Sequence, residues 1–91
     1  MYEITKYSYI QAKKIGVDIR PSTNPHKKID VYKIGVKIAS IGDINYSDYP
    51  TYIISHGIAY ANKRRTLYKI RHEKDIKVIG SPGYYSYMLL W

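Results

Sequence analysis

Two nearly identical hexapeptides constrain the fold of this chain more than any other feature of its sequence. Residues 14–19 read KIGVDI, and residues 33–38 read KIGVKI. Each is short, rich in β-branched residues and divided by a glycine, which is the pattern of a strand joined to its neighbour by a tight turn. Two copies are too few for a repeat architecture. We therefore predict antiparallel β-hairpins in the first half of the chain.

The second hexapeptide gives the better-defined hairpin, because residues 29–33 lead into Ile34-Gly35 and residues 36–41 return. Residues 3–10 alternate loosely between apolar and polar side chains, and we predict a strand there as well. The proline-bounded segment 21–25, PSTNP, predicts an extended polar loop between the two hexapeptides.

The second half of the chain carries helix signals instead. A helix begins near residue 48, Gly57 separates it from a basic helix that runs to about Glu73, and a third helix follows at residues 82–91. The predicted caps and first-turn prolines are Ser47 or Asp48, Pro50, Ser81 and Pro82. The predicted fold is α+β, a single domain over residues 1–91 in which N-terminal antiparallel β-hairpins (1–43) precede two or three helices (46–91).

Composition adds expectations about assembly and location. The apolar residues include fifteen isoleucines and twelve tyrosines but no phenylalanine, so a core this small and aromatic is expected to be completed in a homodimer. The absence of cysteine excludes disulfides and thiolate metal sites. The N-terminal residues lack the features of a signal peptide, and no apolar run approaches the ~20 residues of a membrane span. We expect a protein that is not secreted and has no membrane partner.

Residues 60–77, YANKRRTLYKIRHEKDIK, form the most basic segment. Seven Lys and Arg stand against two acids, a net charge of +5 out of +8 for the chain. On a helix they make a cationic ridge with tyrosines beside it, a surface suited to a polyanion such as nucleic acid. The alternative interpretation is an ordinary solvated surface.

A helical projection at 100° per residue divides this segment into three faces. The apolar stripe, expected to dock on the sheet, is Ala59, Tyr60, Leu67 and Ile70, with Lys63 inside it. The two flanks place Arg64 with Tyr68 and Arg71, and Arg65 with Lys69 and His72. Arg offers a planar fork for phosphate, and Tyr60 or Tyr68 offers a stacking face for a base. The predicted nucleic-acid-binding residues are Lys63, Arg64, Arg65, Tyr68, Lys69, Arg71 and His72.

A structural role for the arginines is an open alternative. Arg64, Arg65 and Arg71 are also placed to clamp internal carboxylates, with His72 donating to a backbone carbonyl. The candidate carboxylates are Asp43, Asp48 and the terminal group of Trp91.

Four short motifs in one order resemble a small uncharacterised protein family of large double-stranded DNA viruses (nucleocytoplasmic large DNA viruses, Marseillevirus- or mimivirus-like). They span roughly residues 28–91 and comprise Ile41-Gly42, Tyr46 with Asp48 and Tyr49, the RRxxYxxRH residues Arg64, Arg65, Tyr68, Arg71 and His72, and Leu90-Trp91. The resemblance implies a viral protein packaged in the particle, and it implies no known activity.

The sequence contains no catalytic constellation, so we expect no enzymatic activity, cofactor or metal. There is no glycine-rich phosphate loop and no paired metal-ligand spacing. Asp43, Asp48 and His56 are the residues that a small metal-dependent nuclease would use. However, Asp48 is better explained as a helix N-cap and Asp43 as a turn residue.

The preferred hypothesis is a non-enzymatic viral protein that binds nucleic acid, DNA in particular, through phosphate contacts. It would act in the virion or in viral factories of the host cytoplasm. The alternative is a structural protein of the particle, in which the tyrosine-rich segment Tyr84–Trp91 docks on other virion proteins. The third hypothesis is a small metal-dependent nuclease.

Overall fold

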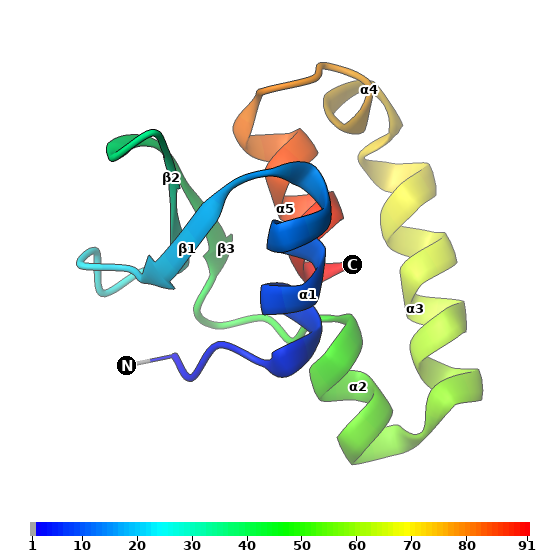
Figure 1. The fold of residues 1–91 in the computed structure, drawn as a ribbon. Helices are drawn as coiled ribbons and strands as arrows, with labels where there is room; N and C mark the ends of the chain where they lie inside the picture. Colours follow the sequence, from blue (N-terminus) through cyan, green and yellow to red (C-terminus); the bar gives the residue numbers. More distant parts are fainter. Residues whose placement is uncertain (1) are drawn as a thin grey trace.

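The computed structural model describes residues 2–91, which form an α+β fold with a three-stranded antiparallel sheet and five helices (Figure 1). The sheet order is β1-β2-β3. In chain order the elements are α1 (Lys6–Ile15), β1 (Asp18–Pro21), β2 (Lys27–Lys33), β3 (Val36–Asp43), α2 (Tyr49–His56), α3 (Ile58–Arg71), α4 (Glu73–Ile76) and α5 (Pro82–Leu90).

Helix α5 lies at the centre of the arrangement, packed on β3 and on α1 (Figure 1). Helices α2 and α3 pack against each other, and α3 stands on the far side of α5 from the sheet. Leu89 and Leu90 of α5 meet Ile29, Val31 and Ile41 of the sheet, and all five are at most 2% exposed. Within residues 2–91, no helix has both the length and the apolar character needed to cross a membrane.

The central strand β2 is buried on both faces, and its second face carries charge. Lys28 is 4% exposed, and its Nζ donates to the Asp48 carboxylate at 3.0 Å. The same carboxylate accepts the Tyr2 hydroxyl (2.7 Å) and the Thr51 N–H (3.0 Å), so it also caps α2. Burial opposes ionisation of Asp48, but these donors outweigh burial and lower its pKa. Asp48 therefore ties the N-terminal segment, the sheet and α2 together.

The predicted β structure before residue 18 is wrong. Residues 3–10 are not a strand: α1 begins after the cap Thr5, whose hydroxyl accepts the Ser8 N–H, and the buried Ser8 hydroxyl donates to the Leu89 carbonyl at 2.6 Å. The first hexapeptide ends this helix at Gly16 and contributes only the start of β1. The Thr5 cap and the Ser8 contact with α5 stabilise a helix in this segment, although its loose alternation of apolar and polar residues had suggested a strand. Four helices rather than two or three follow the sheet.

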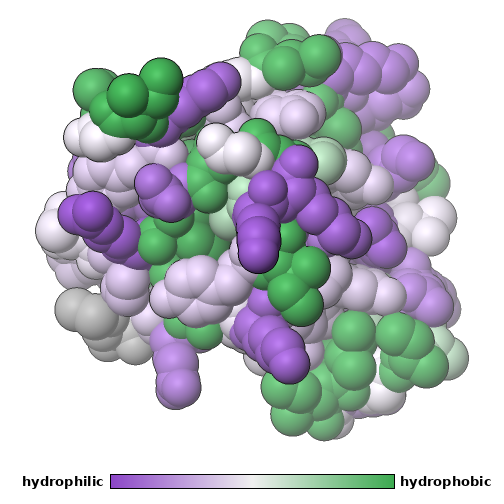
Figure 2. All heavy atoms as spheres, viewed as in Figure 1, coloured by the Kyte–Doolittle hydropathy of each residue, from purple (hydrophilic) through white to green (hydrophobic). Residues whose placement is uncertain are grey.

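The hairpin of the second hexapeptide is confirmed. Lys33 pairs with Val36, so Ile34 and Gly35 form a two-residue turn, with φ angles of 51° and 72°. Positive φ at both positions is typical of a type I′ turn. Ile34 is 93% and Val36 62% exposed. An apolar patch lies at the upper left of Figure 2, where Figure 1 places the β2–β3 hairpin. The predicted caps Asp48 and Ser81 and the first-turn prolines Pro50 and Pro82 are also confirmed.

Replacing Ile34 with Asn should stabilise the protein. A β-branched residue at positive φ is strained, and Asn relieves about 1 kcal/mol of that strain. For a chain of this size we expect the melting temperature to rise by about 4–8 °C. Ile34→Val keeps the β-branch and is the control; an equal rise in both variants would contradict this interpretation.

Asp30, 1% exposed, sits in a second buried polar cluster on β2. It accepts the hydroxyls of Ser22 (2.6 Å) and Ser40 (2.7 Å), and the Lys37 Nζ lies 3.3 Å away. Burial opposes ionisation, but these donors prevail and lower the pKa of Asp30 from 3.8 to about 2.

Stability should therefore fall in acid. A carboxyl group with a depressed folded pKa contributes stability above its unfolded pKa, and this contribution is lost as pH falls through the folded value. We expect Asp30 to account for about 2 kcal/mol of the unfolding free energy lost between about pH 4 and pH 2. Urea unfolding of Asp30→Asn across this range should give a flatter pH dependence than the wild type; parallel curves would refute the assignment.

Candidate nucleic-acid groove

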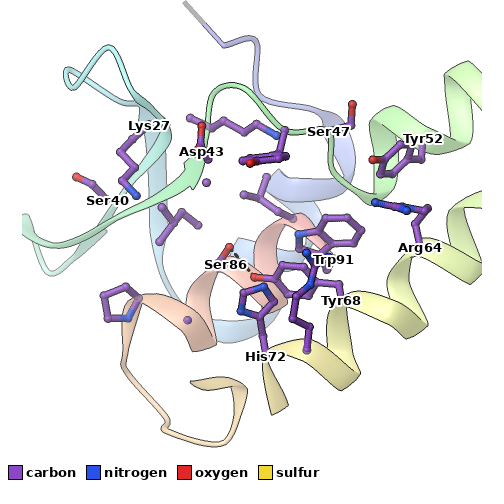
Figure 3. A pocket seen from close by; sticks show the side chains of 18 residues that line it. Lys27, Ser40, Asp43, Ser47, Tyr52, Arg64, Tyr68, His72, Ser86 and Trp91 are labelled. Atoms are coloured by element: carbon purple, nitrogen blue, oxygen red, sulfur yellow. Dashed lines mark hydrogen bonds between the residues drawn. The ribbon is translucent and has the colours of Figure 1, made fainter. Parts of the chain in front are cut away.

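A groove of about 520 Å³ opens between β3, α3 and α5 (Figure 3). Its walls contain both cationic and aromatic side chains. The charged lining residues are Lys27, Lys28, Asp43, Arg64, Arg71 and His72, and the aromatic ones are Tyr46, Tyr52, Tyr68 and Trp91. Lys27, Ser40 and Asp43 lie across the groove from Arg64 and Tyr52 (Figure 3).

Helix α3 presents to the groove the face that was predicted as a flank. Arg64, Tyr68 and Arg71 follow one another at four- and three-residue spacing, so they share one side of the helix. The predicted apolar stripe faces away: Leu67 is 45% and Ile70 68% exposed, and Ala59 and Lys63 are exposed with them. The expected docking of this stripe on the sheet is therefore wrong.

Aromatic stacking explains this rotation of α3. The Tyr68 ring stacks on Trp91 with centroids 4.4 Å apart, and His72 lies 4.3 Å from Tyr68, so the three rings follow one another along the groove (Figure 3). Burial is the main cause that raises the pKa of Tyr68, and its hydroxyl donates to Ser86 at 3.2 Å. Large aromatic rings bury more apolar area than Leu67 and Ile70 would, which favours this face as the inner one.

The arginines do not clamp carboxylates. Across residues 2–91, none of the three guanidinium groups of α3 forms an ion pair within 4 Å. Arg64 lies over the Tyr52 ring (5.6 Å) and Arg65 over the Tyr49 ring (4.8 Å). The Arg64 Nε is buried without a hydrogen-bond partner. The predicted alternative of internal clamps is wrong, and the His72 Nδ1 lies 3.8 Å from the Asp75 carboxylate rather than on a backbone carbonyl.

The buried acids are instead occupied by lysines. Asp48 holds Lys28 and Asp30 holds Lys37, which leaves Asp43 as the acid of the groove. The Asp43 carboxylate accepts the N–H of Asn45 at 2.9 Å, as expected of a turn residue. The groove therefore carries an excess of positive charge next to low-dielectric aromatic walls, where an anion is attracted more strongly than at an open surface.

The structure brings together four of the seven predicted binding residues: Arg64, Tyr68, Arg71 and His72 line the groove. Lys63 and Lys69 are exposed outside it, and Arg65 packs on Tyr49. Sequence reasoning missed Lys27, Tyr46, Tyr52 and Trp91 as lining residues. They come from distant segments, and no local pattern links them to the basic helix.

The residues considered for a nuclease do not gather. Asp48 is fully buried and committed to Lys28, Tyr2 and the α2 cap, while the His56 ring stacks on Tyr60 at 4.4 Å. In the part of the chain that the structure describes, no three His, Asp or Glu side chains are arranged to hold a metal ion.

Comparison of the chain with protein-family models, curated proteins and solved structures found no match. The interpretation of the groove therefore depends on its own geometry and charge.

Gly42 should be essential to the floor of the groove. A Cβ there would lie 2.7 Å from the buried Leu90 Cδ1, at a φ of 78° that side chains rarely adopt. We expect Gly42→Ala to lower the unfolding free energy by about 2–4 kcal/mol, from overpacking and backbone strain together. Gly35→Ala is the matched control, because its φ is 72° but a Cβ meets nothing within 4 Å; thermal melts should show a loss of only about 1 kcal/mol.

Proposed function

We propose that this protein binds nucleic acid without catalysing a reaction, and that it does so by holding backbone phosphates in the groove. The observation that carries the proposal is the pair Arg64 and Arg71, which lines the groove with no carboxylate partner among residues 2–91. Within the part of the chain that the structure describes, the Arg64 Nε is buried without a hydrogen-bond partner, and the guanidinium of the exposed Arg71 is free to bind an anion.

The spacing of the two arginines suits a chain of phosphates. Seven residues on an α-helix correspond to about 10 Å along its axis, so Arg64 and Arg71 can reach different phosphates of one strand. Each guanidinium offers a fork for two phosphate oxygens. Lys27 on the opposite wall adds a third cation. Such contacts give salt-sensitive binding with little base selectivity.

The remaining predicted residues take a weaker part in this proposal. Lys63 and Lys69 lie outside the groove and contribute positive potential at a distance. DNA is the proposed nucleic acid and the virion or viral factory the proposed location, both on the strength of the resemblance to proteins of large DNA viruses. A homodimer remains part of the proposal, supported by exposed Val36 (62%) and Ile38 (39%) on the edge strand β3.

The alternative role, in which Tyr84–Trp91 docks on another virion protein, receives less support. Tyr85, Leu89, Leu90 and Trp91 are each at most 9% exposed. These side chains already form the core of their own fold, so little of the segment is free for a partner.

Two double variants test the proposal, because each removes two positive charges from the same helix. Arg64→Ala/Arg71→Ala should weaken binding to single-stranded DNA by about 10- to 100-fold in filter-binding assays, since two charge-assisted contacts are lost. It should also reduce the slope of log affinity against log salt by about 1.4. Lys63→Ala/Lys69→Ala should change affinity only a few-fold and leave the slope nearly unchanged.

Thermal melts of both variants exclude unfolding as the cause. Equal losses in the two double variants would mean that diffuse charge rather than the groove binds the polyanion. A wild-type protein that fails to bind at low salt would overturn the proposal.

A further inference from the structure

We infer that Tyr46 stacks on an unpaired base, so that the ligand of the groove is single-stranded nucleic acid. This inference rests on the proposed function and names the form of nucleic acid that the groove accepts. It transfers the stacking role predicted for Tyr60 or Tyr68 to a residue of the opposite rim.

The other aromatic rings of the groove are already in use. Tyr68 is stacked with Trp91 and His72 at 4.4 and 4.3 Å, and Trp91 is 9% exposed. Tyr52 is covered by Arg64 and packs against Tyr60 and Trp91. These rings form the wall of the groove, and a base could not insert between them without breaking their stacking contacts.

Tyr46 differs from them in its exposure and in having no aromatic partner among residues 2–91. Its side chain is 70% exposed, although it lines the groove. Among residues 2–91 its ring is in no aromatic pair, and its hydroxyl makes no side-chain hydrogen bond. An exposed aromatic face at the rim of a cationic groove is what a planar base requires.

The backbone under Tyr46 is held in place while its ring stays free. The N–H of Tyr46 donates to the Asp43 carbonyl at 3.1 Å, and the Asp43 carboxylate accepts from Asn45. Two residues later the chain is anchored by the buried Asp48. A stacking platform on a fixed loop loses less conformational entropy on binding than one on a mobile loop.

The combination of Tyr46 with Arg64 and Arg71 defines the chemistry of the ligand. The arginines on α3 attract phosphate, and Tyr46 on the β3–α2 connection offers a face to a base, so a single strand in the groove can contact both walls. The groove volume of about 520 Å³ falls in the range of small-molecule sites. Bases of a duplex are paired and stacked on each other, and only an unpaired base is free to lie on Tyr46.

Binding to a strand without bases distinguishes this inference from the proposed function, because an abasic strand keeps the phosphates but offers nothing to stack on Tyr46. The probes are oligo-dT of about twenty nucleotides, an abasic strand of the same length and a duplex of the same length, measured by isothermal titration calorimetry. The wild type should bind oligo-dT about 5- to 100-fold more tightly than the abasic strand, because stacking needs the base. It should also prefer oligo-dT to the duplex.

The variants assign that preference to one ring. Tyr46→Ala should bind oligo-dT as weakly as the abasic strand and leave binding of the abasic strand unchanged, while Tyr46→Phe should behave like the wild type. Tyr9→Ala, which removes a 51% exposed tyrosine from α1, is the control and should have no effect. If Tyr46→Ala keeps the wild-type preference, or if the duplex binds best, this inference is wrong although the phosphate groove stands. If the wild type binds none of the three probes, the proposed function and this inference both fail.

Discussion

The buried ion pair between Lys28 and Asp48 is the interaction on which the remaining arrangement depends. Desolvating two charges is expensive, and the pair is stable here because the Asp48 carboxylate also accepts the Tyr2 hydroxyl and the Thr51 N–H. Through it, the start of α2 is fixed against the central strand. Helix α2 in turn packs on α3, and α3 places its arginines opposite β3. The geometry of the groove therefore depends on an ion pair of which Lys28 also lines the groove and Asp48 does not.

Lysines and arginines have different partners in this structure. The two buried acids, Asp30 on β2 and Asp48 at the start of α2, pair with lysines, whose compact ammonium groups on flexible stems reach a buried carboxylate. The guanidinium groups of Arg64 and Arg65 instead lie over tyrosine rings, and these contacts keep their charge available. Lys28 both pairs with Asp48 and lines the groove, whereas Arg64 and Arg71 line it without a carboxylate partner among residues 2–91.

Features set by neighbouring residues were predictable from the sequence, and those set by distant contacts were not. The Ile34-Gly35 turn and the Asp48 and Ser81 caps depend on a few adjacent side chains, and the structure confirms them. The two hexapeptides share a pattern, yet one ends a helix and the other forms a hairpin, because Ser8 of the preceding segment bonds to α5. Likewise, hydrophobicity along α3 favoured the wrong face, since Trp91, far away in sequence, determines that Tyr68 turns inward. The groove could be predicted only as a basic helix, because its opposite wall comes from β2 and β3.

The position of Trp91 gives this protein an internal optical probe. It is the one tryptophan in a chain with twelve tyrosines, and it lies in the wall of the groove within 6.1 Å of Tyr52 and 4.4 Å of Tyr68. Indole emission is sensitive to the polarity and charge around the ring, and neighbouring phenols transfer excitation to it. Any molecule that enters between α3 and β3, or any loosening of α5, will therefore change the intrinsic emission without a label. The residue that holds the wall together is also the one that reports on its occupancy.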